Sequence, residues 1–303
     1  MRNILCVTLI ALLGGCTSTS VTEKYQDKRN DIINVKDKVI EFETGNVLIG
    51  SVSRLYMSNK CLLIADHKSV DKQIHIFNKN DFSYLTSIGN FGEGPEEITV
   101  MGCLAIDEAH HQLYVSDHAK QKIFSYDMDS VMVDSLYKPQ VKTAMNETLF
   151  PSEYQYINDT LSIAVLIKPT STSTFNQFLG RWNMNTGEMI PMKYTHPDIQ
   201  KKRITFAASE KAGIYVECYT RHDLMTICSL DGELLYNIYG PDWDGGNGNK
   251  LQSFGTVMIG NDKIFVSYCG EDYARDSFPT KILVFDLEGN YLKTLETGYK
   301  ISD

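Results

Sequence analysis

A repeat of roughly 40–50 residues, which begins near residue 48, constrains this chain more than any other feature. Each repeat holds up to four short apolar or alternating runs, separated by residues that favour turns. The first repeat has these runs at 47–57, 61–65, 73–77 and 84–88, and the second has them at 103–107, 112–116, 122–126 and 131–136. The residues match as well, because LIADH at 63–67 aligns with YVSDH at 114–118.

Three further repeats follow the same pattern. Their runs lie at 154–158, 161–167, 178–183 and 189–194; at 204–208, 213–219, 225–230 and 234–239; and at 255–259, 263–268, 282–286 and 291–295. Turns rich in Gly, Asn and Asp join the third and fourth runs, and these residues tolerate the positive φ of hairpin turns. No long helical period separates the runs. The sequence therefore predicts an all-β fold, a β-propeller whose four-stranded blades are the repeats.

The repeats allow two interpretations of the number of blades. Five full repeats are present, and a short apolar run at 39–42 precedes them, where a strand would complete a sixth blade. Residues 299–303 fall where the inner strand of that blade would begin. Either five blades close the ring, or the chain is a six-bladed propeller that lacks most of its last blade. We favour the second, because the N-terminal run needs partner strands, although an open ring leaves strand edges exposed.

The first 16 residues, MRNILCVTLIALLGGC, have the form of an export signal. Arg2 precedes an apolar run over 4–13, which is shorter than the roughly 20 residues that span a bilayer. LGGC at 13–16 resembles the lipobox of bacterial lipoproteins, which implies cleavage after residue 15 and lipidation of Cys16. An ordinary secretory signal is the alternative. We expect a signal peptide at 1–15, a lipidated polar tether at 16–35 and the propeller at 36–303.

The residues after Cys16 bear on the location. Thr17 follows Cys16, as in lipoproteins that are sent to the outer membrane, and no acidic residue comes before Glu23. Lipoproteins that reach the surface of Bacteroidota carry acidic residues directly after the cysteine. We therefore expect an outer-membrane lipoprotein that faces the periplasm, with the cell surface as the alternative. The membrane would be a partner through the lipid on Cys16.

The charge of the chain limits its partners. Removing residues 1–15 takes away Arg2, which leaves 28 Lys and Arg (29 minus 1) against 38 Asp and Glu, a formal charge of −10. Nucleic acids and anionic lipid surfaces carry the same sign of charge. The composition therefore argues against both as partners of the folded domain.

Five cysteines remain once Cys6 is removed and Cys16 is lipidated: Cys61, Cys103, Cys218, Cys228 and Cys269. No CxxC pair occurs, so a zinc or redox motif is unsupported. Cys218 and Cys228 flank a short turn and could form a disulfide across a hairpin in an oxidising compartment. Buried free thiols are the favoured alternative, because an odd number leaves at least one cysteine unpaired.

The most distinctive segment is IGNFGEGPEEI at 88–98, which follows an I-x-I-F run. This pattern resembles the six-bladed β-propeller lipoproteins of Bacteroidota, often described as TolB-like or NHL-like. The resemblance covers roughly residues 37–303, and the missing C-terminal blade is where this chain departs from it. The resemblance implies the fold and a location in the cell envelope. It implies no catalytic residues, because most members have no assigned activity.

Loop lengths predict which end of the propeller binds a ligand. In a propeller, the connection from the fourth strand of one blade to the first strand of the next lies on the same face as the connection between the second and third strands of a blade. The connections between the first and second strands and between the third and fourth strands lie on the opposite face. The first group is long, at 89–98, 137–152, 168–175, 195–202, 240–252 and 269–280. Long loops on a rigid scaffold commonly bind ligands. We call this side the loop-rich face.

The candidate ligand-binding residues all belong to the loop-rich face: Gly92, Glu93, Gly94, Glu96, Glu97, Asp66, His67, Asp117, His118, Asp242, Trp243 and Asp244. The glutamates would bind a cation or hydroxyl groups, or only solvate a turn. The Asp-His pairs would be metal ligands, for example of zinc, or turn-capping aspartates. Trp243 would stack on a sugar or pack within its loop. Residues 242–244 resemble a calcium loop but depart from the EF-hand pattern at Gly246, Asn247 and Ser253.

No catalytic triad, phosphate loop or paired-carboxylate motif occurs in the sequence. The leading hypothesis is therefore a lipid-anchored, non-enzymatic binding module for an envelope protein or a glycan. The alternative is a metal-dependent propeller hydrolase, lactonase or lyase, with a divalent cation near the channel mouth. A third interpretation is a non-functional fragment. We predict no cofactor for the binding module, and a divalent cation for the alternative.

Overall fold

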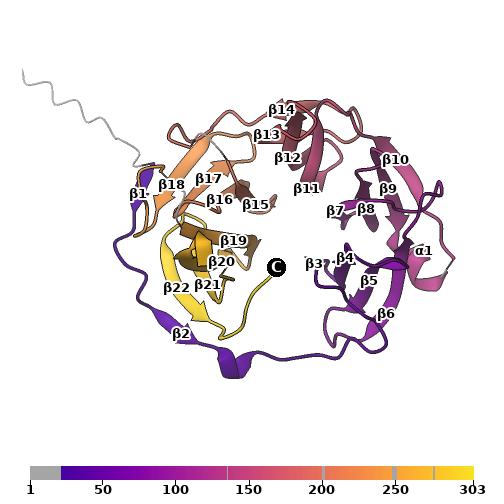
Figure 1. The fold of residues 1–303 in the computed structure, drawn as a ribbon, viewed down its shortest axis with the longest axis horizontal. Coiled ribbons are helices and arrows are strands. Elements are labelled where there is room, and N and C mark those ends of the chain that lie inside the picture. The colour runs from indigo at the N-terminus through magenta and orange to yellow at the C-terminus, as the bar shows by residue number, and fades with distance from the viewer. Residues whose placement is uncertain (1–21, 135, 200–201, 248–250, 276) are drawn as a thin grey trace, which may run out of the picture.

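The computed structural model describes residues 22–134, 136–199, 202–247, 251–275 and 277–303. Its strands form five sheets, each containing four consecutive antiparallel strands, arranged around a common centre (Figure 1). The predicted β-propeller with four-stranded blades is therefore confirmed. Within the described ranges, no helix is long and apolar enough to cross a bilayer. The predicted signal peptide and Cys16 lie outside the described residues.

The blades follow one another along the chain. The first contains β3 (Ser53–Met57), β4 (Cys61–Asp66), β5 (Lys72–Asn78) and β6 (Tyr84–Asn90). The second contains β7 (Met101–Asp107), β8 (Gln112–Asp117), β9 (Lys122–Asp127) and β10 (Gln140–Ala144). The third contains β11 (Phe150–Asn158), β12 (Leu161–Pro169), β13 (Phe175–Trp182) and β14 (Met189–Pro191).

The fourth blade contains β15 (Ile204–Ser209), β16 (Ile214–Tyr219), β17 (Leu224–Ser229) and β18 (Leu234–Tyr239). The fifth contains β19 (Leu251–Gly260), β20 (Lys263–Asp272), β21 (Lys281–Asp286) and β22 (Tyr291–Glu296), and the short 3-10 helix η2 (Tyr273–Arg275) follows β20. The predicted turns join the third and fourth strands of the third, fourth and fifth blades. Gly187, Gly232 and Gly289 take φ values of +76°, +85° and +80°, which glycine adopts without strain.

One predicted strand is wrong. Residues 131–136 were expected to form the fourth strand of the second blade, but Met128–Val133 is the helix α1. Asp127 begins this helix, because its carboxylate accepts a hydrogen bond from Ser130 N at 2.7 Å. Strand β10 pairs with β9 instead. The long connection of this blade therefore joins its third and fourth strands, opposite the loop-rich face, and the predicted long loop at 137–152 is also wrong.

The N-terminal segment adds strands to the outer edges of two blades. β1 (Glu23–Tyr25) runs parallel to β18, and β2 (Ile32–Asn34) runs parallel to β22 (Figure 1). Part of the segment assigned to the tether thus lies on the propeller and covers two strand edges. The 3-10 helix η1 (Lys36–Lys38) follows. The predicted strand at 39–42 is wrong, because these residues form no strand and Phe42 stacks on Phe82 at 4.6 Å.

Hydrophobic clusters join neighbouring blades. One lies between the first and second blades, and others join the second to the third, the third to the fourth and the fourth to the fifth. Among the described residues, no such cluster joins the fifth blade to the first. On this side Figure 1 shows the ribbon between η1 and β3 and the C-terminal segment, which reaches toward the centre. Asp303 bridges the two blades by accepting hydrogen bonds from Leu55 N (2.6 Å) and Thr256 Oγ1 (3.0 Å).

All five described cysteines are buried free thiols, as the favoured interpretation expected. The disulfide proposed between Cys218 and Cys228 is wrong. Cys218 pairs with Met225 and Cys228 pairs with Tyr215, so the two thiols project from opposite faces of the β16–β17 hairpin. Cys218 packs toward the fifth blade and Cys228 packs toward the third.

Candidate functional site

The loop at 91–100, between β6 and β7, is held together by its own residues. Glu97 Oε2 accepts a hydrogen bond from Gly94 N at 2.8 Å. Lys120 donates to the carbonyl oxygens of Gly94 (2.5 Å) and Glu97 (2.6 Å). Gly92 has a φ of +157°, which other residues rarely adopt, and a Cβ atom there would lie 2.0 Å from Glu97 Oε2, so a side chain at this position would displace the Glu97 carboxylate. Gly92, Gly94 and Glu97 therefore shape the loop, and the Glu97 carboxylate is turned toward the backbone of its own loop.

Ile98 of this loop is buried in the core, whereas several other side chains of the loop are exposed. Glu96 forms an ion pair with Lys138 at 2.7 Å, and both side chains are well exposed, so the pair contributes little stability. Glu93 is exposed and has no hydrogen bond or ion pair with another described residue. Phe91 and Val100 are also exposed, at 45% and 50%. The outer surface of the loop thus presents one free carboxylate between two apolar side chains.

The two Asp-His pairs do not form a common metal site. Asp66 accepts hydrogen bonds from Gly50 N (2.7 Å) and Lys68 N (2.9 Å). Asp117 is fully buried and accepts four backbone hydrogen bonds, from Thr99, Val100, Ala119 and Lys120. Both aspartates therefore cap turns.

The histidines of these pairs are half-buried beside the capped turns. His67 Nδ1 lies 3.2 Å from Met101 O, to which it donates as the Nδ1 tautomer. Burial lowers the pKa of both His67 and His118, which favours the neutral imidazole. In the part of the chain that the structure describes, neither histidine belongs to a group of three potential metal ligands.

The candidates at 242–244 lie at the surface, where Asp242 and Asp244 are exposed and Trp243 is half-buried. Trp243 packs against Tyr239, with ring centroids 5.0 Å apart, and against His196 at 5.8 Å. Trp243 is half-buried, and these ring contacts are those of a packed loop tryptophan, while stacking on a sugar stays a prediction. Asp242 accepts a hydrogen bond from Tyr268 OH at 3.1 Å, while Asp244 lies 3.7 Å from His222 Nδ1 and is partly exposed.

A buried ion pair lies beside Asp242, and the sequence analysis missed it. Arg29, between β1 and β2, contacts Asp223 at 2.9 Å, and their side chains are 7% and 0% exposed. The guanidinium also lies 5.3 Å from the ring centre of Tyr268. Burial raises the pKa of Asp223, and the charge of Arg29 opposes this rise. No sequence signal marked this contact, because Arg29 lies in an otherwise ordinary polar segment.

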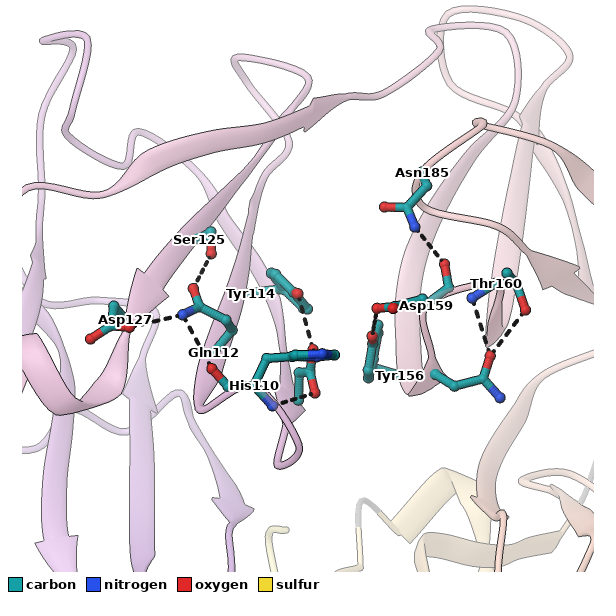
Figure 2. Close-up of polar contacts among 11 residues, drawn as sticks. His110, Gln112, Tyr114, Ser125, Asp127, Tyr156, Asp159, Thr160 and Asn185 are labelled. Carbon is teal, nitrogen blue, oxygen red and sulfur yellow. Dashed lines mark hydrogen bonds and ion pairs between the residues drawn. The ribbon is translucent and has the colours of Figure 1, made fainter.

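A second polar group lies on the opposite face, between the second and third blades (Figure 2). We call it the Asp107–His110–Asp159 cluster. Asp107 ends β7, His110 follows it in the β7–β8 turn, and Asp159 lies in the β11–β12 turn. One ligand atom of each residue lies within 4.8 Å of the others. It is the one group of three such residues within the described ranges.

Hydrogen bonds organise this cluster. His110 Nδ1 lies 2.8 Å from Asp107 Oδ2, and Tyr114 OH donates to the same oxygen at 3.3 Å. Tyr156 OH donates to Asp159 Oδ1 at 2.7 Å. Burial opposes ionisation of Asp107, which is 2% exposed, but its hydrogen bonds with the side chain and backbone of His110 outweigh burial and lower its pKa. The hydrogen bond to Asp107 raises the pKa of His110.

The sequence held a signal for this cluster that the sequence analysis did not use. Asp107 and His110 are three residues apart in the turn between the first two strands of one repeat. Asp159 occupies the equivalent turn of the next repeat. Equivalent turns of neighbouring blades lie side by side. An alignment of the repeats would therefore have predicted that Asp159 lies near Asp107 and His110.

Comparisons with known proteins identify the fold. A family model, DUF5128, described as a 6-bladed beta-propeller, matches residues 17–178. Among solved structures, a member of the duf4221 family from Bacteroides vulgatus has a TM-score of 0.54 and 12% identity, with 80% of each chain covered. A Bacteroides fragilis protein described as exported has a TM-score of 0.53 and 13% identity, with 92% of this chain and 80% of that chain covered. No curated protein matches this chain.

Proposed function

Because this chain belongs to the DUF5128 family of 6-bladed β-propellers, we propose that it is a binding module of the bacterial cell envelope, which engages a protein or a glycan through its loop-rich face. The family is described with six blades, and the described residues form five. A propeller holds its loops on rigid strands, so a partner meets a surface whose shape is already set.

The observation that carries this proposal is the set of apolar side chains exposed on the loop-rich face. They are Val70, Phe91, Val100, Phe175 and Phe278, with exposed fractions between 45% and 81%. Phe91 begins a loop that Lys120 and Glu97 fix in place, and Phe91 N donates to Asp71 O at 2.7 Å. Exposed aromatic side chains on rigid loops are favoured anchors of interfaces, because little conformational entropy is lost when they are covered.

Changing Phe91 and Glu93 together to alanine should reduce partner binding at least tenfold, because truncating one interface anchor commonly costs about 2 kcal/mol or more. The measurement is affinity capture from envelope extracts and glycan arrays, quantified against the unchanged protein. Val133→Ala is the matched control, since Val133 is 86% exposed on α1, at the opposite face. Equal capture by the double variant and the unchanged protein would contradict the loop-rich face as the binding surface.

We further propose that Cys16 is lipidated and anchors the propeller to the outer membrane, facing the periplasm. The LGGC motif at 13–16 supports this, as does the description of one fold neighbour as exported. Acyl chains contribute about 0.8 kcal/mol of membrane binding for each buried CH₂ group. Cys16→Ser should move the protein from the membrane fraction to the soluble fraction and abolish incorporation of labelled palmitate. Retention in the membrane fraction would contradict lipidation.

The second candidate function is a metal-dependent hydrolase, lactonase or lyase. Its predicted ligands near the channel mouth are poorly suited, because Asp66 and Asp117 already accept backbone hydrogen bonds. The Asp107–His110–Asp159 cluster supports this candidate function instead, because its three residues could hold a metal ion. It lies on the face opposite the loop-rich face, where the metal was expected. Hydrolysis of ester and lactone substrates by metal-loaded protein would support it, and activity that persists in Asp159→Asn would exclude this cluster as its site.

A further inference from the structure

We propose that the Asp107–His110–Asp159 cluster binds one divalent transition-metal ion, such as Zn²⁺ or Mn²⁺, between the second and third blades. This site goes beyond the proposed binding function, because it lies on the face opposite the loop-rich face. It would hold two neighbouring blades through a shared ion.

The donor set fits such an ion. It offers one imidazole nitrogen and two carboxylates, with one ligand atom of each within 4.8 Å of the others. Imidazole favours zinc and other late transition metals, whereas carboxylates also accept manganese. A set of three protein ligands leaves a coordination position for water, as in many zinc sites. Two carboxylates with a neutral imidazole would also balance the charge of a divalent ion.

Surrounding groups hold the ligands in place. Tyr114 OH donates to Asp107, and Tyr156 OH donates to Asp159 at 2.7 Å, so each carboxylate is oriented by a phenol (Figure 2). Asn185 fixes the β11–β12 turn by donating from its side chain to Asp159 O at 2.8 Å. Such supporting hydrogen bonds are typical of metal sites, where they orient the ligands and tune their basicity.

The burial of Asp107 is a second, independent feature. This carboxylate is 2% exposed, and its Oδ2 lies 2.8 Å from His110 Nδ1 and 3.3 Å from Tyr114 OH, so the structure holds it almost completely out of water. A buried charge is costly unless a counter-charge or a metal compensates it. Within the described residues, the counter-charge in contact with Asp107 is His110, whose side chain is 58% exposed. The exposed side of the cluster gives an ion a route to the buried carboxylate.

Binding would link blades that otherwise meet through a hydrophobic cluster. Asp107 and His110 belong to the second blade, and Asp159 belongs to the third. An ion that binds the folded chain and not the unfolded chain stabilises the fold in proportion to the logarithm of its concentration. The site therefore predicts a metal-dependent unfolding temperature, which can be measured without any assay of activity.

The test uses the purified full-length chain, treated with a chelator and then titrated with ZnCl₂ by calorimetry. Parallel thermal unfolding is recorded with and without Zn²⁺. We expect one zinc per chain and a rise of several degrees in the unfolding temperature, reversed by EDTA. His110→Asn and Asp159→Asn should each weaken zinc binding at least about tenfold and remove the thermal shift. Both side chains are exposed, so both variants should fold.

His111→Asn is the matched control, because His111 is the neighbouring exposed histidine and bonds to Asp129, outside the cluster. It should bind zinc within about twofold of the unchanged protein. Unchanged affinity in His110→Asn and Asp159→Asn, an equal loss in His111→Asn, or no saturable zinc binding would overturn the proposal. Parallel titrations with MnCl₂, CaCl₂ and MgCl₂ test the class of ion, and binding of Ca²⁺ or Mg²⁺ alone would overturn the transition-metal assignment.

Discussion

Arg29→Ala is expected to lower the free energy of unfolding by about 3–5 kcal/mol, because it leaves Asp223 buried without its partner. Asp223 is fully buried, and Arg29 contacts both of its carboxylate oxygens, at 2.9 and 3.2 Å. Without Arg29 the buried carboxylate must either stay charged without a counter-charge or take up a proton, although Asp242 N and Tyr268 OH still donate to it. The variant also loses the contacts of the guanidinium with three aromatic rings. Urea unfolding at pH 7.5 measures the change.

A double variant separates the ion pair from the packing. Arg29→Met with Asp223→Asn keeps side chains of similar size and removes both charges. Its unfolding free energy should lie well above that of Arg29→Ala, since no unpaired charge stays buried. If Arg29→Ala costs less than about 1 kcal/mol, the pair resembles a surface salt bridge, and the N-terminal segment contributes little to the stability of the fourth and fifth blades.

Acid is expected to destabilise the fold between about pH 6.5 and pH 5.5, because burial lowers the pKa of five histidines, which are His67, His75, His118, His196 and His222. Above pH 6.5 these histidines are neutral in both states, so they add no pH dependence. Below it the unfolded chain binds protons that the folded chain does not bind, and the free energy of unfolding falls. Each histidine that stays neutral at pH 5.5 contributes a loss of at most about 1.4 kcal/mol.

The measurement is the urea midpoint at pH 7.5 and pH 5.5. His75 is 6% exposed and its Nδ1 lies 2.8 Å from Ser87 Oγ, a contact that glutamine can reproduce. His75→Gln should therefore reduce the difference in stability between the two pH values by about one fifth. A stability that is equal at both pH values would show that these histidines take up protons in the folded state.

The local features of the blades were predictable from the sequence. Short alternating runs separated by Gly, Asn and Asp specify strands and tight turns, and each turn depends only on its own residues. Gly232, for example, adopts a φ of +85° in the turn between β17 and β18. The repeat then placed equivalent runs in equivalent strands. The exception was residues 131–136, where an apolar run fits a strand or a short helix, and the hydrogen bond from Ser130 N to Asp127 favours the helix.

The contacts between distant segments were not predictable. Arg29 meets Asp223 across 194 positions of the sequence, and nothing near either residue indicates the other. The register between β16 and β17 also determines whether Cys218 and Cys228 can form a disulfide. In the observed register the two thiols lie on opposite faces of the hairpin, so they cannot. For the candidate site, the sequence predicted a loop at 89–98 on the loop-rich face, but not that Glu97 would bond within that loop and leave Glu93 exposed.

We propose that the loop-rich face binds a partner in the cell envelope. A photo-crosslinking amino acid placed at position 93 in living cells tests it most directly, because Glu93 is exposed and no described residue bonds to it. The same probe at position 133, on α1, is the matched control. We predict a discrete crosslinked product from position 93 and none from position 133. Products from position 133 alone, or from neither position, would contradict the claim.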